Sequence, residues 1–132
     1  MTGSGSFAAF ERFRQPQVID ERHLAGMTLG DTRLEREVLE LFLSRATAML
    51  ERAGTAAPTS AAAAAHTLKG SARAIGAWRL ALAAESFEQA VACTEEIQIK
   101  EALEELRAAA LEVSAAIAAR LDRSSTRQGR DR

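Results

Sequence analysis

The sequence predicts an all-α fold, an antiparallel up-down-up-down four-helix bundle with one or two short N-terminal helices, on three observations. Apolar residues recur three and four positions apart along four long segments, and no segment alternates as a strand would. Hydrophobic residues, many of them alanine, make up 47% of the chain and aromatic residues only 5%, which suits closely packed helices. With 132 residues, the chain has the length of one domain with one core.

The N-terminal part holds the candidate short helices. Residues 1–14 form a lead-in that can contain a short helix, because three phenylalanines recur about once per turn before Pro16 ends the segment. A second short helix is expected to begin behind Asp20 as its N-cap and to run to about Met27.

The first long helix is expected to run to about Ala53, where Gly54 ends it. Either Asp31 or Thr32 can be its N-cap, and Thr32 with Glu35 has the spacing of a capping box. The apolar stripe predicted to face the core consists of Leu34, Val38, Leu41, Phe42, Met49 and Leu50.

The second long helix carries His66. Thr55 is its expected N-cap, and Pro58 fits its first turn, where backbone N–H groups have no partner within the helix. Gly76 is the expected end of this helix.

Two further helices complete the bundle, which we place at residues 15–122. One runs from Trp78 to about Ala92, and the other begins at Thr94 as N-cap. Their predicted core residues are Leu80, Ala84, Phe87 and Val91 in the former, and Ile99, Leu103, Leu106, Ala110, Val113, Ile117 and Leu121 in the latter. Residues 123–132 are polar and are expected to be a disordered tail.

Charge and composition exclude several classes of function. The formal net charge of -1 gives no general attraction to nucleic acid or anionic lipid, so neither partner is expected. No run of eighteen apolar residues and no signal sequence is present, which predicts a cytoplasmic protein without a membrane contact. The single cysteine, Cys93, is interpreted as a small buried hydrophobic residue, and His23 as structural or surface.

The helical wheel predicts that His66 points outward. At 100° per residue, the apolar side chains of its helix gather on one side, and these are Ala61, Ala65, Leu68, Ala72 and Ile75. The opposite side carries His66, Lys69, Gly70 and Arg73.

Small residues surround the histidine on this exposed face. They are Ala62, Ala63, Gly70, Ala74 and Ala77. Gly70 costs about 1 kcal/mol of helix propensity relative to alanine, so close access for a docking protein is the proposed reason for it. We therefore predict that Ala62, Ala63, Ala74, Ala77 and Arg73 line a partner-binding surface.

The chemistry of this face fits a phosphoryl carrier. Imidazole has an unperturbed pKa of about 6.5, so an unprotonated ring nitrogen is available as a nucleophile at neutral pH. Lys69, three residues further on, can reach a dianionic phosphoryl group on the ring, with Arg73 as a possible second cation. At about 4 Å, each unit charge contributes roughly 1 kcal/mol in water and roughly 4 kcal/mol at an effective dielectric of 20.

These residues resemble a known signature. Residues 66–72 read HTLKGSA and residues 75–77 read IGA, which is similar to the motif of histidine-containing phosphotransfer (HPt) domains. The similarity extends from about Asp20 to Leu121 and includes the upstream segment LELFL at residues 39–43.

The resemblance implies roles for individual residues. His66 would accept a phosphoryl group from the aspartate of one receiver domain and pass it to another. Lys69 would stabilise the phosphate, Gly70 would give clearance, and Gly76 matches the later glycine near the turn. The implied partners are response-regulator receiver domains and a sensor or hybrid histidine kinase. Mg²⁺ would come from the receiver, with no metal or cofactor held by this chain, and we expect a monomer.

Two alternatives stay open from the sequence. The chain could be the phosphate-accepting module of a chemotaxis-type histidine kinase, although it has no ATP-binding motif and is a phosphocarrier rather than a self-contained enzyme. It could also dock on receivers or kinases without being phosphorylated, although His66 and Lys69 argue against this. A metal-dependent hydrolase is disfavoured because the two histidines lie far apart in sequence.

Overall fold

The computed structural model describes residues 17–130, and their side chains as far as residue 123. This part of the chain is all-helical and contains no strand. Its helices are, in chain order, α2 (Glu21–Met27), α3 (Thr32–Thr55), α4 (Pro58–Ala74), α5 (Trp78–Cys93) and α6 (Glu96–Arg130). The lead-in at residues 1–14, with its expected short helix, lies outside the described residues.

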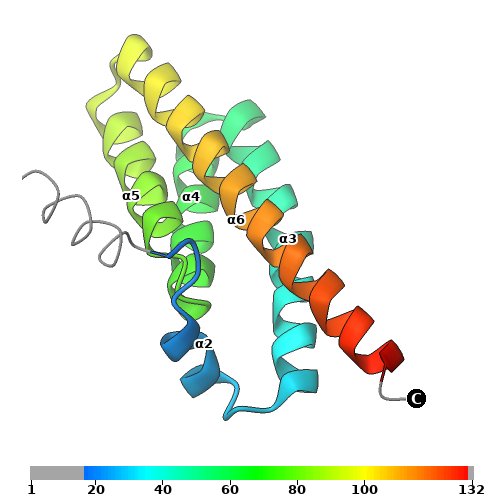
Figure 1. The fold of residues 1–132 in the computed structure, drawn as a ribbon. Helices are drawn as coiled ribbons and strands as arrows, with labels where there is room; N and C mark the ends of the chain where they lie inside the picture. Colours follow the sequence, from blue (N-terminus) through cyan, green and yellow to red (C-terminus); the bar gives the residue numbers. More distant parts are fainter. Residues whose placement is uncertain (1–16, 131–132) are drawn as a thin grey trace, which may run out of the picture.

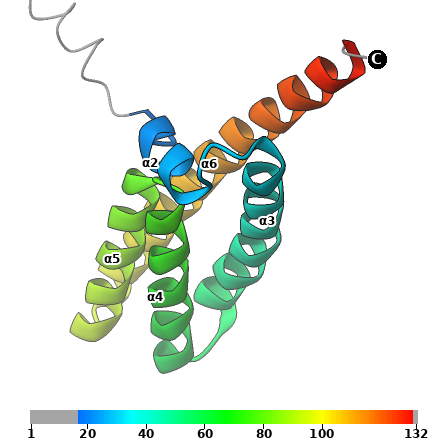
Figure 2. The same cartoon turned by 90° about the horizontal axis from the view of Figure 1, so that it is seen from below.

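Helices α3 to α6 form the antiparallel four-helix bundle that the sequence predicts, and α2 lies at one end of it (Figure 1). Around the bundle α3 packs on α4, α4 on α5, α5 on α6, and α6 on α3. Figure 2 shows the C-terminal part of α6 projecting past the start of α3. Each bundle helix therefore turns one side to the core and leaves another side for solvent or a partner.

The core lies between the four bundle helices and under α2. Its largest fully buried hydrophobic side chains are Phe87, Leu24, Leu39, Leu68, Ile75, Leu80, Leu106, Ile117 and Val113. In α5 all four predicted core residues are buried, whereas the stripe predicted for α3 is partly wrong. Leu41 is 53% exposed and Leu34 lies at the surface, while Leu39 and Ala46 are buried. Segment 38–43 has more apolar residues than one helix side can bury, so periodicity alone does not select among them.

Asp31, one of the two predicted candidates, is the N-cap of α3. Its carboxylate accepts hydrogen bonds from the backbone N–H groups of the second and third helical residues, at 3.0 and 3.1 Å. Thr32 is already helical, so it cannot form the predicted capping box with Glu35. Glu35 instead pairs with Arg120 of α6, which ties the start of α3 to the last helix.

The predicted end of α3 and the predicted N-caps of α4 and α6 are wrong. Helix α3 continues through Gly54 to Thr55, so Thr55 does not cap α4, which begins at Pro58 with Ala57 as N-cap. The hydroxyl of Thr55 donates to the carbonyl of Glu51 in its own helix, so it does not cap α4. Thr94 does not begin α6 either, because it ends α5 in the left-handed conformation, with φ of 58°.

Helix α6 continues to Arg130, beyond the predicted end at Leu121 and into the segment 123–132 that was expected to be a disordered tail. A helix that has already nucleated gains one hydrogen bond for each residue added, and no glycine or proline interrupts residues 122–128. Cys93 also differs from its prediction, because the last residue of α5 is exposed rather than buried.

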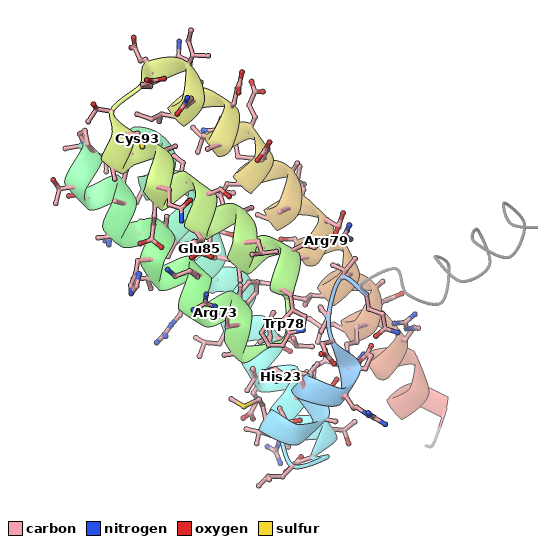
Figure 3. The ribbon with its side chains drawn as sticks, turned by 90° about the vertical axis from the view of Figure 1, so that its left-hand side faces the viewer. His23, Arg73, Trp78, Arg79, Glu85 and Cys93 are labelled. Atoms are coloured by element: carbon pink, nitrogen blue, oxygen red, sulfur yellow. The ribbon has the colours of Figure 1, made fainter. Side chains whose placement is uncertain are left out.

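Asp20 fastens α2 to the turn between α4 and α5. Its backbone N–H donates to the carbonyl of Gly76 at 2.9 Å, and its carboxylate accepts from the backbone of His23 at 3.1 Å and from Nε1 of Trp78 at 3.0 Å. The rings of His23 and Trp78 meet edge to face at 4.8 Å, as Figure 3 allows the reader to follow. The hydrogen bond from Trp78 is the main cause of the lowered pKa of Asp20.

The predicted short helix with Asp20 as its N-cap, ending at Met27, is confirmed.

Candidate functional site

Helix α4 presents His66 to solvent, as the sequence predicts. Alanine residues fill most of its first half and favour the helix, and Pro58 stands at its first position. Its buried side consists of Ala61, Ala64, Ala65, Leu68 and Ala72, followed by Ile75 as C-cap. On the opposite side the His66 side chain is 69% exposed, so a second protein can reach the ring.

Glu88 of α5 completes a cluster with His66 and Lys69. Because α4 and α5 are antiparallel neighbours, a residue 22 positions further along the chain lies directly beside the histidine. Oε2 of Glu88 is 3.1 Å from Nδ1 of His66, and Oε1 is 2.8 Å from Nζ of Lys69. The second contact is an ion pair. One carboxylate thus bridges an ammonium and an imidazole.

The contact with Glu88 assigns the tautomer of His66. An ionised carboxylate can only accept hydrogen bonds, so Nδ1 must carry the proton and donate to Oε2. In the neutral ring Nε2 then keeps its lone pair. The arrangement therefore leaves one nucleophilic nitrogen, on an exposed side chain, with its ring orientation fixed from the other side.

Glu88 is anionic at neutral pH. Partial burial raises the pKa of its carboxyl, but the interactions with Lys69 and His66 outweigh this and lower the pKa below its ordinary value. Only 23% of the Glu88 side chain is exposed, so these two interactions must compensate for the water that its charged carboxylate loses. The cluster therefore keeps its acceptor for Nδ1–H across the physiological pH range.

The two predicted cations differ in their surroundings. Only 14% of the Lys69 side chain is exposed to solvent. Its ammonium contacts the carboxylate of Glu88, which in turn contacts the imidazole of His66. Arg73 is 55% exposed and lies 4.0 Å from Glu85 of α5. Arg73 and Glu85 lie on the same face of the molecule, and Trp78 lies further along this face toward α2 (Figure 3). The ammonium of Lys69 is therefore mostly covered and held by Glu88, whereas Arg73 stays open to solvent beside Glu85.

Most of the small residues predicted around His66 are accessible. Ala63 and Ala74 are exposed, Ala62 is half-buried, and a Cβ added at Gly70 would meet nothing within 4 Å. Ala77 is fully buried, so its predicted place on the exposed face is wrong. The left-handed turn at Gly76, with φ of 78°, directs Ala77 into the core, where its N–H donates to the carbonyl of Ala72 at 2.8 Å.

Sequence reasoning missed Glu88 and Glu85. Both stand on α5 beside its buried stripe, three residues apart, and they face Lys69 and Arg73, which are four residues apart on α4. Complementary charges at helical spacing on two consecutive antiparallel helices were the available signal. That signal becomes specific only when the register between α4 and α5 is known.

Residues 17–123 hold no group of three or more histidine, cysteine, aspartate or glutamate side chains arranged to bind a metal ion. None of the helices described combines the length and the apolar character needed to cross a membrane.

Comparison with known proteins gives two matches. The family model described as Hpt domain matches residues 37–124. The structure of a candidate histidine-containing phosphotransfer protein from rice is similar to this chain, with a TM-score of 0.77, 21% sequence identity, and 92% of each chain covered. At this identity, the similarity to the rice protein establishes the fold alone. No curated protein matches the sequence.

Proposed function

This chain belongs to the family of Hpt domains, which transfer phosphoryl groups through a histidine, and on that premise we propose that His66 is the phosphorylated residue. In this proposal His66 accepts the group at Nε2 from the aspartyl phosphate of one receiver domain and passes it to the aspartate of another. The contact between Glu88 and Nδ1 carries the proposal, because it leaves Nε2 as the nucleophile on a side chain that is 69% exposed.

The transfer step follows from this geometry. The Nε2 lone pair forms a bond to phosphorus while the bond between phosphorus and the aspartate oxygen breaks, and the aspartate leaves as a carboxylate. The ring still carries its Nδ1 proton and becomes positively charged, and the anionic Glu88 stabilises this charge. Transfer to the next receiver reverses these steps, so Glu88 assists in both directions.

Lys69 and Gly70 support the same step in different ways. Lys69 holds Glu88 in place before transfer, and its flexible side chain can turn toward the phosphoryl group once the dianion is present. Gly70 leaves open space one turn after His66, where a larger side chain would meet the docking receiver. The exposed or half-exposed Ala62, Ala63 and Ala74 extend this access.

Hpt domains interact with receiver domains and histidine kinases in phosphorelays, and for this chain we assign both kinds of partner. The Mg²⁺ ion needed at the aspartate belongs to the receiver, so the site in this chain requires no cofactor of its own. We place the protein in the cytoplasm as a monomer that meets its partners by diffusion. These assignments rest on the family and on the open face around His66.

The test is transfer of radiolabelled phosphate from a panel of isolated receiver domains, each phosphorylated in the presence of Mg²⁺. The wild type and a His23→Gln control, which alters the only other histidine of the sequence, should both take up an acid-labile, base-stable label. The His66→Gln variant should take up none. Equal labelling of the His66→Gln variant and the wild type would overturn the proposal. Incubation with ATP alone should give no label in any variant.

A further inference from the structure

A second charge pair stands beside the proposed phosphorylation site. Arg73 and Glu85 bridge α4 and α5 one helical turn further along the seam than Lys69 and Glu88. Arg73 follows His66 by seven residues, which places it about 10 Å away along the helix and about 20° around it. His66 and the pair formed by Arg73 and Glu85 therefore lie on one exposed face of the molecule. Figure 3 shows Arg73 and Glu85 on this face.

A partner that reaches His66 must also cover this pair. A specific protein interface buries about 800 Å² on each partner, equivalent to a disc about 16 Å in radius. A receiver centred on Nε2 would therefore place its own side chains over Arg73 and Glu85, both of which lie within that radius along the α4 and α5 seam.

The fold itself gains little from this pair. The two charged groups are 4.0 Å apart, with 55% of the Arg73 side chain and 40% of the Glu85 side chain exposed. Surface ion pairs of this kind add little to the stability of a fold. Lys69 and Glu88, by contrast, are 2.8 Å apart, mostly covered, and joined to the histidine. The charges of Arg73 and Glu85 are thus available for contacts with a second protein.

We infer that Arg73 and Glu85 select among receiver domains, favouring a receiver that places an acidic side chain against Arg73 and a basic one against Glu85. This inference rests on the proposed function of His66. The cation stands on α4 and the anion on α5, so the pair has a fixed polarity across the seam. A receiver with the opposite arrangement of charges would meet like charges at both positions, which disfavours its docking.

A double charge swap, Arg73→Glu with Glu85→Arg, tests the inference. The swap keeps an ion pair at the seam but reverses its polarity. The matched control is the same swap at Arg79 and Glu112, a similarly exposed pair between α5 and α6. For each protein the transfer rate from every member of a panel of phosphorylated receiver domains is divided by the rate of direct labelling with phosphoramidate.

The Arg73 and Glu85 swap should lower the normalised kcat/KM for the best wild-type donor about tenfold, mainly through KM, and should change the rank order of the receivers. The Arg79 and Glu112 swap should leave the rank order unchanged. An unchanged rank order in the first swap, with the wild type labelled normally, would overturn this inference and leave the proposed function standing. A wild type that takes no label from any receiver or from phosphoramidate would overturn both.

Discussion

The carboxylate of Glu88 lies 3.1 Å from Nδ1 of His66, across the seam between α5 and α4. This contact determines which ring nitrogen carries the proton, and the same carboxylate also holds the ammonium of Lys69. A surface histidine without such a partner would exchange between tautomers and orientations. The Glu88 contact thus orients an exposed imidazole and leaves Nε2 with its lone pair.

Replacing Glu88 should slow phosphorylation of His66. Glu88→Ala removes both the acceptor and the charge, so labelling with phosphoramidate should fall about tenfold, by analogy with the lower end of the range for partners that orient metal-binding histidines. Glu88→Gln keeps an acceptor oxygen, so its labelling rate should lie between the rates of Glu88→Ala and the wild type. Ring ¹⁵N chemical shifts should show the Nδ1–H tautomer in the wild type and a mixture in Glu88→Ala. The exposed Glu104→Ala on α6 is the control, and equal rates in all four proteins would contradict the prediction.

Replacing His66 itself should leave the fold intact. Its side chain is 69% exposed, so the free energy of unfolding of His66→Gln should lie within about 0.5 kcal/mol of the wild type. Urea denaturation followed by circular dichroism measures this difference. A loss of several kcal/mol would show that the imidazole is a structural element rather than an accessible carrier.

The contribution of Glu88 to stability should depend on pH. The pKa of Glu88 is lowered in the folded protein, so its ionised form stabilises the fold above the ordinary pKa of 4.5, and this stabilisation is lost as the pH falls through the folded value. The difference in unfolding free energy between the wild type and Glu88→Gln, at most about 1 kcal/mol, should be present above the ordinary carboxyl pKa of 4.5 and should shrink as the pH falls below it. Denaturation series across the pH range test this, and a difference that grows as the pH falls below 4.5 would have the wrong sign.

Two substitutions at Gly70 should separate stability from docking. Space around this position is open, so Gly70→Ala should raise the free energy of unfolding by about 1 kcal/mol through helix propensity. Gly70→Leu should also fold but should impair transfer from receivers, because the larger side chain occupies the docking face. Direct labelling with phosphoramidate serves as the internal reference. If Gly70→Leu accepts phosphate from receivers at the normal rate, Gly70 is not needed to give a docking receiver space.

Gly76 should be the least replaceable glycine outside the site. Its φ is 78°, and an added Cβ would lie 2.8 Å from Cβ of Asp20 and 3.0 Å from the Asp20 carbonyl oxygen. Gly30→Ala is the matched control, because φ there is also positive, at 72°, but the space is open. Backbone strain alone should lower the free energy of unfolding of Gly30→Ala by about 1–2 kcal/mol. In Gly76→Ala this free energy should fall by at least about 1 kcal/mol more. Equal losses in urea denaturation would contradict the close packing of α2 on this turn.

The features that sequence predicts well are those determined within one helix. The outward direction of His66 follows from the positions of Leu68 and Ile75 on its own helix, and the cap at Asp20 follows from local backbone chemistry. Glu88 was missed because its role depends on the register between two helices, which periodicity does not determine.

The remaining errors arise at turns and in sequences that are compatible with two structures. Ala77 was misplaced because the left-handed turn at Gly76 changes the direction of the chain. Thr94 has the side chain of an N-cap but occupies a left-handed C-cap, a choice that the chain geometry between α5 and α6 decides. Leu41 was assigned to the core because α3 contains more apolar residues than its buried side accommodates.

The central claim is most directly tested by identifying the phosphorylated atom. Phosphorus and nitrogen NMR of the protein, labelled through a phosphorylated receiver domain, should show one phosphoramidate with phosphorus bonded to Nε2 of His66 and a proton on Nδ1. A phosphoryl group on Nδ1 of His66, or on another residue, would contradict the orientation that Glu88 imposes on the ring.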